Sequence, residues 1–204
     1  MRLLAVSDLH GDEAALGKVV SRAKDYGYVL VAGDIGGEES FAEELAAPGN
    51  VFAIPGNGDG DFLDKIFKGR FIHGKRVELE EGLSLVGFGF SPPTPFHTPL
   101  EFPEDKLHGW MKGLQMDGGT IFLTHAPPHG IMDEVRGGHA GSTAVRETIE
   151  EKKPLLNACG HIHEREGVGG LGGTSILKVG AAKLGRCGTI EIKKGKMELR
   201  NVEL

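Results

Sequence analysis

The chain has 204 residues, of which 39% are hydrophobic and 25% are charged, and its formal net charge is −6. This length allows one sizeable hydrophobic core and predicts a single domain spanning residues 1–204. The acidic balance leaves no broad basic surface, which favours a small substrate over long nucleic acid as the partner. The two cysteines provide no disulfide framework and no apolar run is long enough to span a bilayer, so we expect a cytoplasmic protein without a membrane partner. The oligomeric state stays open, with a homo-oligomer as one option.

An apolar segment at residues 3–6 leads directly into Asp8 and His10. The same arrangement, a run of strand length followed by a potential metal ligand, recurs four times. The runs at 28–32, 51–55, 120–124 and 155–159 lead into Asp34, Asn57, His125, and the pair His161 and His163. In open α/β sheets, ligands bind at the carboxyl ends of the strands. The five strand ends are therefore predicted to bring these side chains to one edge.

Helical patterns separate the first three predicted strands. Asp12 and Glu13 suit the start of a helix, which Gly27 can stop. Two further helical stretches are predicted at residues 38–47 and 62–69. Strands that alternate with helices in this way predict an α/β fold with a parallel sheet.

Beyond residue 75 the pattern changes to paired strands. Residues 77–80 and 83–88 predict a hairpin that begins a second sheet. The proline-rich stretch at 91–99 fits neither a helix nor a strand. It is a candidate rim or lid of a site, and a rigid surface connection or a subunit contact is the alternative.

Ser142 is a suitable N-cap for a helix over residues 143–152, which Pro154 would stop. The glycine-rich stretch at 167–173 lacks the spacing of a phosphate-binding loop, and we expect a flexible turn there. The remaining strand-like segments are residues 175–179, 189–192 and 197–202.

Carboxylate, imidazole and amide donors together suit a borderline divalent ion such as Mn, Fe, Zn, Ni or Co. Seven candidate ligands are too many for one ion, whereas two ions that share a bridging carboxylate would use them all. Two ions held about 3.5 to 4 Å apart can bind a bridging hydroxide as nucleophile and brace the oxygens of a phosphoryl group. The donor set therefore predicts a dinuclear centre that hydrolyses a phosphoester.

The set of motifs also resembles a known family, the calcineurin-like metallophosphoesterases, over residues 8–163. The motifs stand in the family's order: Asp8-x-His10, Gly33-Asp34, Gly56-Asn57, His125 and Gly160-His161-x-His163. The resemblance implies an α/β fold of two facing mixed β-sheets flanked by helices, a four-layer α/β/β/α sandwich. It also implies the metal ligands: Asp8, His10 and His163 for the first ion, Asn57, His125 and His161 for the second, and Asp34 as the bridge.

The third motif departs from the family pattern. Members often have Gly-Asn-His there, and the histidine serves as acid to the leaving group, but this chain has Gly56-Asn57-Gly58. Some small prokaryotic members, many of which act on diesters, similarly lack it. We therefore expect hydrolysis of phosphodiesters or activated phosphoesters, with a phosphomonoester phosphatase as the alternative. A second alternative is a non-catalytic protein-interaction scaffold, but a scaffold would be free to lose ligands, and here every metal position is filled.

The catalytic acid has no clear candidate in the sequence. His129 and His139 follow His125 on the next loop and could touch the substrate, or they could be ordinary surface histidines. Asn57 and His129 are the predicted substrate-binding residues. Asp59 could orient Asn57, and a plain turn aspartate is the alternative.

Overall fold

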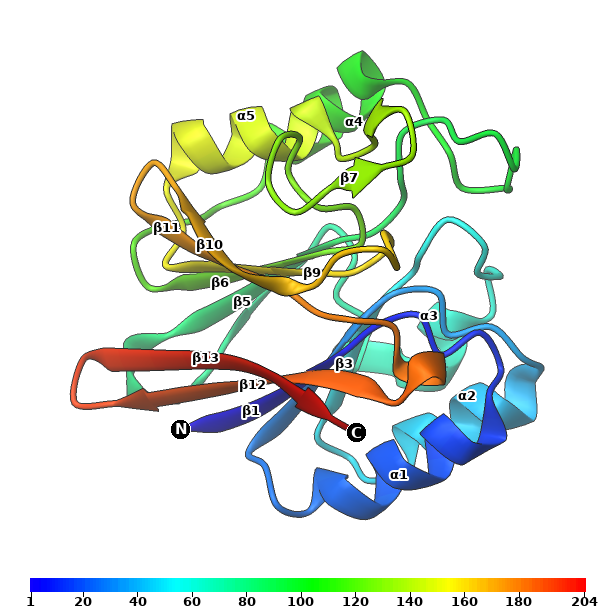
Figure 1. Cartoon of the computed structure of the whole chain (residues 1–204). Coiled ribbons are helices and arrows are strands. Elements are labelled where there is room, and N and C mark those ends of the chain that lie inside the picture. Colours follow the sequence, from blue (N-terminus) through cyan, green and yellow to red (C-terminus); the bar gives the residue numbers. More distant parts are fainter.

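The computed structural model describes residues 1–204 and contains two β-sheets that pack face to face (Figure 1). The first sheet consists of β1 (Arg2–Val6), β2 (Tyr28–Ala32), β3 (Val51–Ile54), β12 (Arg186–Lys193) and β13 (Lys196–Glu203), in the order β13-β12-β1-β2-β3. The second consists of β4 (Arg76–Glu78), β5 (Ser84–Phe88), β6 (Thr120–Thr124), β9 (Leu156–Cys159), β10 (Gly167–Leu171) and β11 (Thr174–Lys178), in the order β10-β11-β9-β6-β5-β4. Both sheets mix parallel and antiparallel pairs.

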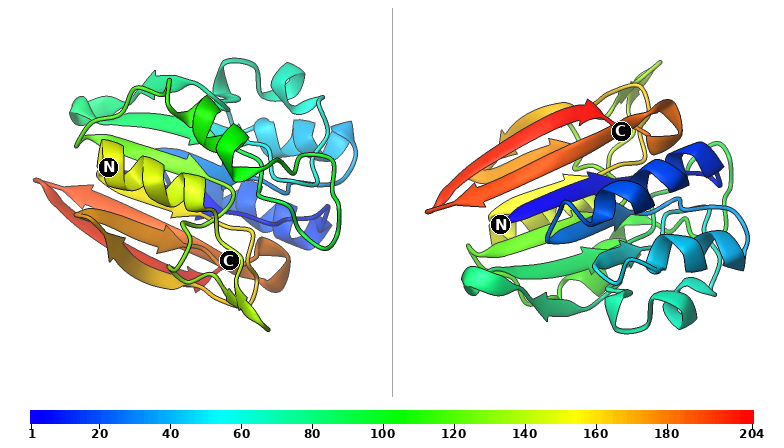
Figure 2. Two further views of the ribbon diagram at one scale, coloured as in Figure 1. Left: turned by 90° about the horizontal axis from the view of Figure 1, so that it is seen from above. Right: turned by 90° about the horizontal axis from the view of Figure 1, so that it is seen from below.

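Helices cover the outer face of each sheet (Figure 2). The first sheet is covered by α1 (Glu13–Ala23), α2 (Glu39–Ala46) and α3 (Leu63–Phe67), and the second by α4 (Glu104–Met111) and α5 (Thr143–Lys152). Three short 3-10 helices are η1 (Lys68–Arg70), η2 (Glu80–Gly82) and η3 (Ala182–Leu184). The strands β7 (Glu134–Val135) and β8 (Gly138–His139) form a separate two-stranded sheet. The predicted four-layer α/β/β/α architecture is confirmed. None of the helices has the length and apolar character needed to cross a bilayer.

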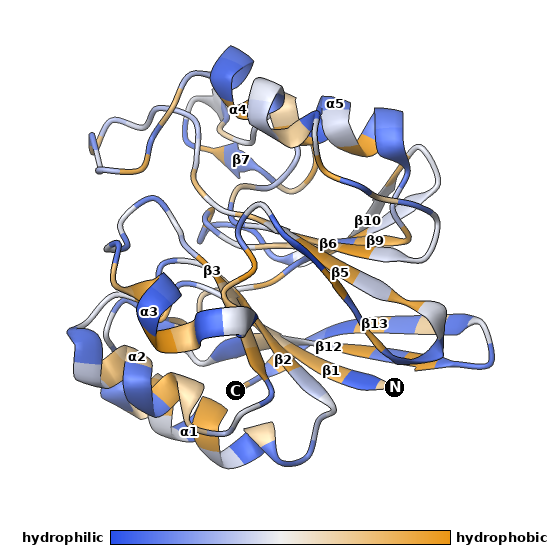
Figure 3. Ribbon diagram, turned by 180° about the vertical axis from the view of Figure 1, so that it is seen from behind, coloured by the Kyte–Doolittle hydropathy of each residue, from blue (hydrophilic) through white to orange (hydrophobic).

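Three buried apolar clusters separate the four layers, and β1 shows why the sequence produces them. Leu4 and Val6 pack into the cluster beneath α1 and α2, whereas Leu3 and Ala5 face the second sheet. Successive side chains of a strand point to opposite faces, so a strand covered on both faces is apolar throughout. Figure 3 shows the same pattern as hydrophobic colouring on the central strands and on the inner faces of the helices.

The predicted helix starts are confirmed in atomic detail. Asp12 accepts a hydrogen bond from Ala15 N at 2.8 Å, and Ser142 accepts one from Val145 N at 3.1 Å. Each cap pairs a backbone N–H group that has no partner within its own helix. The predicted hairpin is also present as the antiparallel pair β4 and β5.

The prediction of a flexible turn at residues 167–173 is wrong. Residues 167–171 form β10, an edge strand that pairs antiparallel with β11, and the turn is confined to Gly172 and Gly173. The backbone alone makes a β-ladder, so glycines do not prevent pairing.

Candidate metal centre

The candidate ligands lie where the carboxyl ends of strands from both sheets meet. Asp8, His10, Asp34 and His161 adopt left-handed backbone conformations, with φ between 50° and 72°. Such conformations cost on the order of 1–3 kcal/mol each and cluster at functional sites, where the surrounding structure maintains them. These sharp turns directly follow β1, β2 and β9.

Two glycines allow the loops after β2 and β3 to touch. Gly33 has a φ of +86°, and a Cβ atom there would lie 2.5 Å from Gly56 N. A Cβ atom at Gly56 would lie 2.0 Å from an oxygen of Asp34. Side chains at either position would push Asp34 away from the ligands on the neighbouring strands.

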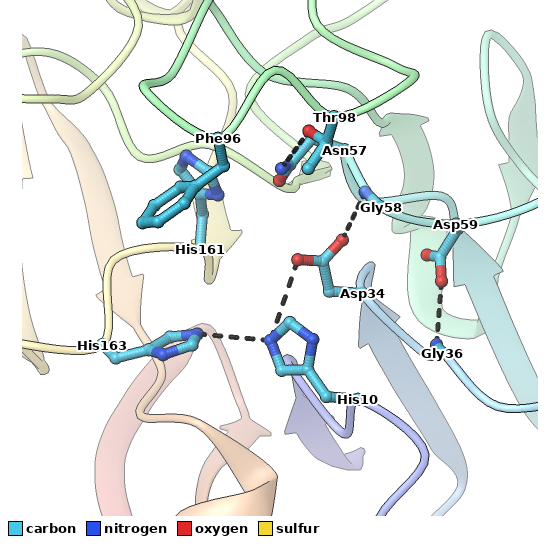
Figure 4. Close-up of a pocket in the computed structure, with 10 residues that line it drawn as sticks. All are labelled: His10, Asp34, Gly36, Asn57, Gly58, Asp59, Phe96, Thr98, His161 and His163. Atoms are coloured by element: carbon cyan, nitrogen blue, oxygen red, sulfur yellow. Dashed lines mark hydrogen bonds and ion pairs between the residues drawn. The ribbon is translucent and has the colours of Figure 1, made fainter.

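The first ligand group consists of Asp8, His10 and His163. His163 Nε2 lies 3.1 Å from Asp8 Oδ1, and His10 Nε2 lies 3.6 Å from the same oxygen. The two imidazole nitrogens are 3.5 Å apart (Figure 4). Burial alone would raise the pKa of Asp8, but its contacts with His10 and His163 lower the pKa well below the ordinary range. The carboxylate is therefore ionised, as a metal ligand must be.

The second group consists of Asp34, His125 and His161, whose donor atoms all lie within 4.8 Å of one another. His125 is fully buried, and its ring lies 4.7 Å from that of His161. Burial, reinforced by the nearby His125, lowers the pKa of His161 to about 3. The imidazole of His161 is thus neutral at pH 7 and keeps a lone pair for a cation.

Two lone pairs face each other between Asn57 and His125. Asn57 Nδ2 donates to Thr98 Oγ1 at 2.7 Å, so the amide oxygen must be the atom that faces His125. His125 Nδ1 lies 2.7 Å from the carbonyl of Ala32, which can only accept, so the ring proton is on Nδ1. With a neutral ring, the form that binds a metal ion, His125 Nε2 and Asn57 Oδ1 are then two acceptors 2.8 Å apart. Such an arrangement calls for a positive centre between them, and a metal ion is one that all these donors fit.

Asp34 lies between the two groups. One of its oxygens, Oδ2, is 3.8 Å from His10 Nε2 and 3.6 Å from His125 Nε2. The other oxygen, Oδ1, accepts a hydrogen bond from Gly58 N at 3.0 Å. The carboxylate is therefore held with one oxygen turned towards both groups.

A loop that the sequence describes only as a candidate rim holds Asn57 in place. Glu101 accepts four hydrogen bonds from Thr94 and Thr98, two from backbone N–H groups and two from hydroxyls. Partial burial alone would raise the pKa of Glu101, but these hydrogen bonds lower it to about 2. An ionised Glu101 thus fixes the hydroxyl of Thr98, which in turn fixes the amide of Asn57.

A buried lysine, Lys178, holds the loop that carries His161 and His163. Lys178 is 1% exposed, and its ammonium group donates to the carbonyls of Ile162, Arg165 and Val179 at 2.7, 3.2 and 3.0 Å. Burial lowers the pKa of Lys178, and the three carbonyls compensate by accepting its hydrogen bonds. Two of these carbonyls belong to the loop that carries His161 and His163.

The other predicted residues lie elsewhere. His139 Nδ1 donates a hydrogen bond to the carboxylate of Asp133 at 2.6 Å, and the His139 ring is 5.4 Å from that of His129. Neither histidine lines the cavity at the metal centre, which has a volume of about 380 Å³. Asp59 contacts the backbone N–H groups of Gly36 and Gly56 rather than Asn57, in agreement with the turn-aspartate alternative.

Comparison with known proteins identifies the class to which this arrangement belongs. Residues 1–192 match the family described as the calcineurin-like phosphoesterase superfamily domain. An uncharacterized protein of Methanocaldococcus jannaschii, MJ1162, is 32% identical over 192 residues, which cover 87% of each chain.

Solved structures share the fold. A dimetal phosphatase from Danio rerio superposes with a TM-score of 0.69 at 10% identity, covering 98% of this chain and 95% of its own. A protein described as a novel archaeal phosphodiesterase superposes with a TM-score of 0.57 at 14% identity, covering 99% and 100%. The family match and the donor set define an enzyme that hydrolyses phosphoric ester bonds, and the solved structures share its fold. The chain belongs to the calcineurin-like phosphoesterase superfamily, which is metal-dependent.

Proposed function

We propose that the protein is a phosphodiesterase that uses a dinuclear metal centre. In this proposal Asp8, His10 and His163 hold one ion, Asn57, His125 and His161 hold the other, and Asp34 is shared between them. The observation that carries the proposal is the position of Asp34, whose Oδ2 lies within 4 Å of a histidine nitrogen from each group. A carboxylate that faces both groups can neutralise part of the charge of two neighbouring cations.

Two bound ions would polarise the phosphoryl oxygens and lower the pKa of the attacking water. The protein's part is to orient the donors. Gly58 N keeps Asp34 turned towards both groups, and Thr98 keeps the oxygen of Asn57 pointed at His125. Hydrolysis adds water across one P–O bond and gives a phosphomonoester and an alcohol, so the leaving oxygen must also gain a proton.

The cavity provides no free acid for that proton. Its ionisable side chains are proposed metal ligands, apart from Asp59, whose two oxygens accept hydrogen bonds from backbone N–H groups. The position that carries a histidine in many relatives is Gly58. This favours esters with good leaving groups, and favours diesters over alkyl monoesters. The names of the two structural relatives, a phosphodiesterase and a phosphatase, are compatible with either class of substrate.

A screen of metals against substrates tests the proposal. Demetallated protein would be reloaded with Mn, Fe, Zn, Ni or Co and assayed on monoesters, diesters and cyclic nucleotides. Because the donors are nitrogen and oxygen atoms without thiolate, we expect Mn to be among the activating ions, with aryl diesters as the best substrates. Hydrolysis of monoesters alone would contradict the proposed specificity.

A further inference from the structure

An exposed phenylalanine stands at the mouth of the metal centre. Phe96 belongs to the proline-rich loop and is 83% exposed. It is the hydrophobic residue among those that line the cavity at the metal centre. In Figure 4 its ring lies on the same side of this cavity as His161 and His163. An aromatic face left open beside a set of charged ligands offers a stacking surface to a substrate.

A second cavity continues from this point. It has a volume of about 530 Å³ and shares Phe96, His161 and His163 with the first cavity. The two cavities therefore adjoin at Phe96 and the two histidines, and together they are called the groove. A substrate larger than a phosphate group can occupy both parts.

The second cavity carries unpaired positive charge. Arg136 and Lys183 are exposed on its lining and form no ion pair, whereas the nearby Arg165 pairs with Glu134 at 3.6 Å. Glu164 is the one carboxylate on the lining. In a chain with a formal net charge of −6, this part of the groove suits a negatively charged group.

We propose that the substrate is a phosphodiester of the nucleotide type. Its reacting phosphoryl group lies at the metal centre, its nucleobase stacks on Phe96, and a second anionic group lies beside Arg136 and Lys183. This inference rests on the proposed function, because it names the substrate class of the same site. Stacking on an aromatic side chain strengthens the binding of a base by roughly 5- to 100-fold.

The first test compares two diesters with the same leaving group, a nucleoside 5′-(para-nitrophenyl phosphate) and methyl para-nitrophenyl phosphate. We expect kcat/KM to be roughly 5- to 100-fold higher for the nucleoside ester. Phe96→Ala should remove this preference, because kcat/KM falls more for the nucleoside ester than for the methyl ester, while Phe96→Tyr should keep it. Val168→Ala, at an exposed apolar residue of β10, is the control.

The second test measures binding to metal-loaded protein by calorimetry. Adenosine 5′-monophosphate should bind more tightly than ribose 5-phosphate in the wild type and not in Phe96→Ala. Adenosine 3′,5′-bisphosphate should bind more tightly still, and Arg136→Ala or Lys183→Ala should each weaken it about two- to fivefold. Arg165→Ala is the matched control.

The two proposals fail in different ways. If the methyl ester is hydrolysed as well as the nucleoside ester and Phe96→Ala changes neither, the inference about the groove is wrong and the diesterase activity stands. If no diester is hydrolysed, the proposed function is wrong, and the calorimetric comparison still decides whether Phe96 binds a base. Equal binding of ribose 5-phosphate and adenosine 5′-monophosphate would overturn the inference.

Discussion

The orientation of one amide, that of Asn57, depends on a residue 41 positions further along the chain. Thr98 Oγ1 accepts a hydrogen bond from Asn57 Nδ2 and donates one to Glu101, so the hydroxyl links the amide to the carboxylate. The Thr98→Val variant removes both contacts, because valine has a similar shape and no hydroxyl. We expect it to lower metal affinity or kcat/KM by roughly 10- to 100-fold, as is typical of residues that orient metal ligands.

Metal titration and steady-state kinetics would measure this effect. Thr98→Ser, which keeps the hydroxyl, is the matched control and should retain most of the activity. Wild-type metal affinity and kinetics in Thr98→Val would show that Asn57 needs no such support.

A second prediction for a single residue concerns Gly58, which provides no general acid. A positioned general acid contributes about 100- to 10,000-fold, and without one the rate should depend steeply on the leaving group. We expect a plot of log rate against leaving-group pKa for a diester series to be steep in the wild type and flatter in Gly58→His. The position can accept a side chain, because Gly58 has no left-handed φ and a Cβ atom would come no closer than 3.6 Å to Asp34.

The same plot decides between other sources of the proton. A shallow wild-type slope that steepens in His129→Ala or His139→Ala would identify that histidine as the acid. A shallow slope in the wild type and in all these variants, with chemistry rate-limiting, would contradict the account of Gly58.

The sequence indicates the candidate ligands more readily than the residues that hold them in place. Each ligand follows an apolar run, which is a local pattern, and all of them converge in the structure. The contacts of Thr98 and Lys178 join segments that are distant in sequence, and neither residue type signals such a role on its own. Such contacts become visible only once the chain is folded.

At the scale of elements, the loop after β9 depends on its neighbour β11. Lys178, the last residue of β11, donates to carbonyls on both sides of His163. Lys178→Met keeps the volume and leaves these carbonyls without partners. We expect a loss of about 1–3 kcal/mol in the free energy of unfolding and a metal affinity at least about 10-fold weaker.

Metal affinity distinguishes two roles of Lys178, namely positioning of the metal ligands and general stability of the fold. A variant destabilised elsewhere, Ile190→Val in β12, should keep wild-type metal affinity although its free energy of unfolding falls. Equal metal affinity in Lys178→Met and the wild type would show that the lysine serves stability alone.

Element boundaries followed local patterns wherever an apolar run or a cap was present. The strands of the first sheet and α5 lie within one or two residues of their predicted limits, apart from the longer β12. The edge strand β10 was missed because its glycines carry no side-chain pattern, and its pairing with β11 is set by the backbone. The helix α4 was also not predicted, although Leu107 and Met111 anchor it to the core.

At the scale of the whole molecule, the acidic net charge favours the binding of small esters over the binding of long nucleic acid. Proteins that hold long duplexes neutralise many phosphates and lose affinity steeply with salt. With a formal net charge of −6, we expect substrate binding to depend on metal occupancy far more than on bulk salt. Binding measurements at several salt concentrations, with a nucleotide and with duplex DNA, would check this. Tight and steeply salt-dependent binding of long duplex DNA would contradict it.

The central claim is that both sheets contribute to one site for two ions joined by Asp34. The most direct measurement is the metal content per chain of the reloaded wild type, of Asp34→Asn, and of Asp61→Asn, which changes an exposed carboxylate on the loop after β3. The wild type and Asp61→Asn should each bind two ions. Asp34→Asn should lose at least one ion and most of its activity while its circular dichroism stays that of the folded protein. Two ions and intact activity in Asp34→Asn, or a single ion in the saturated wild type, would contradict the account.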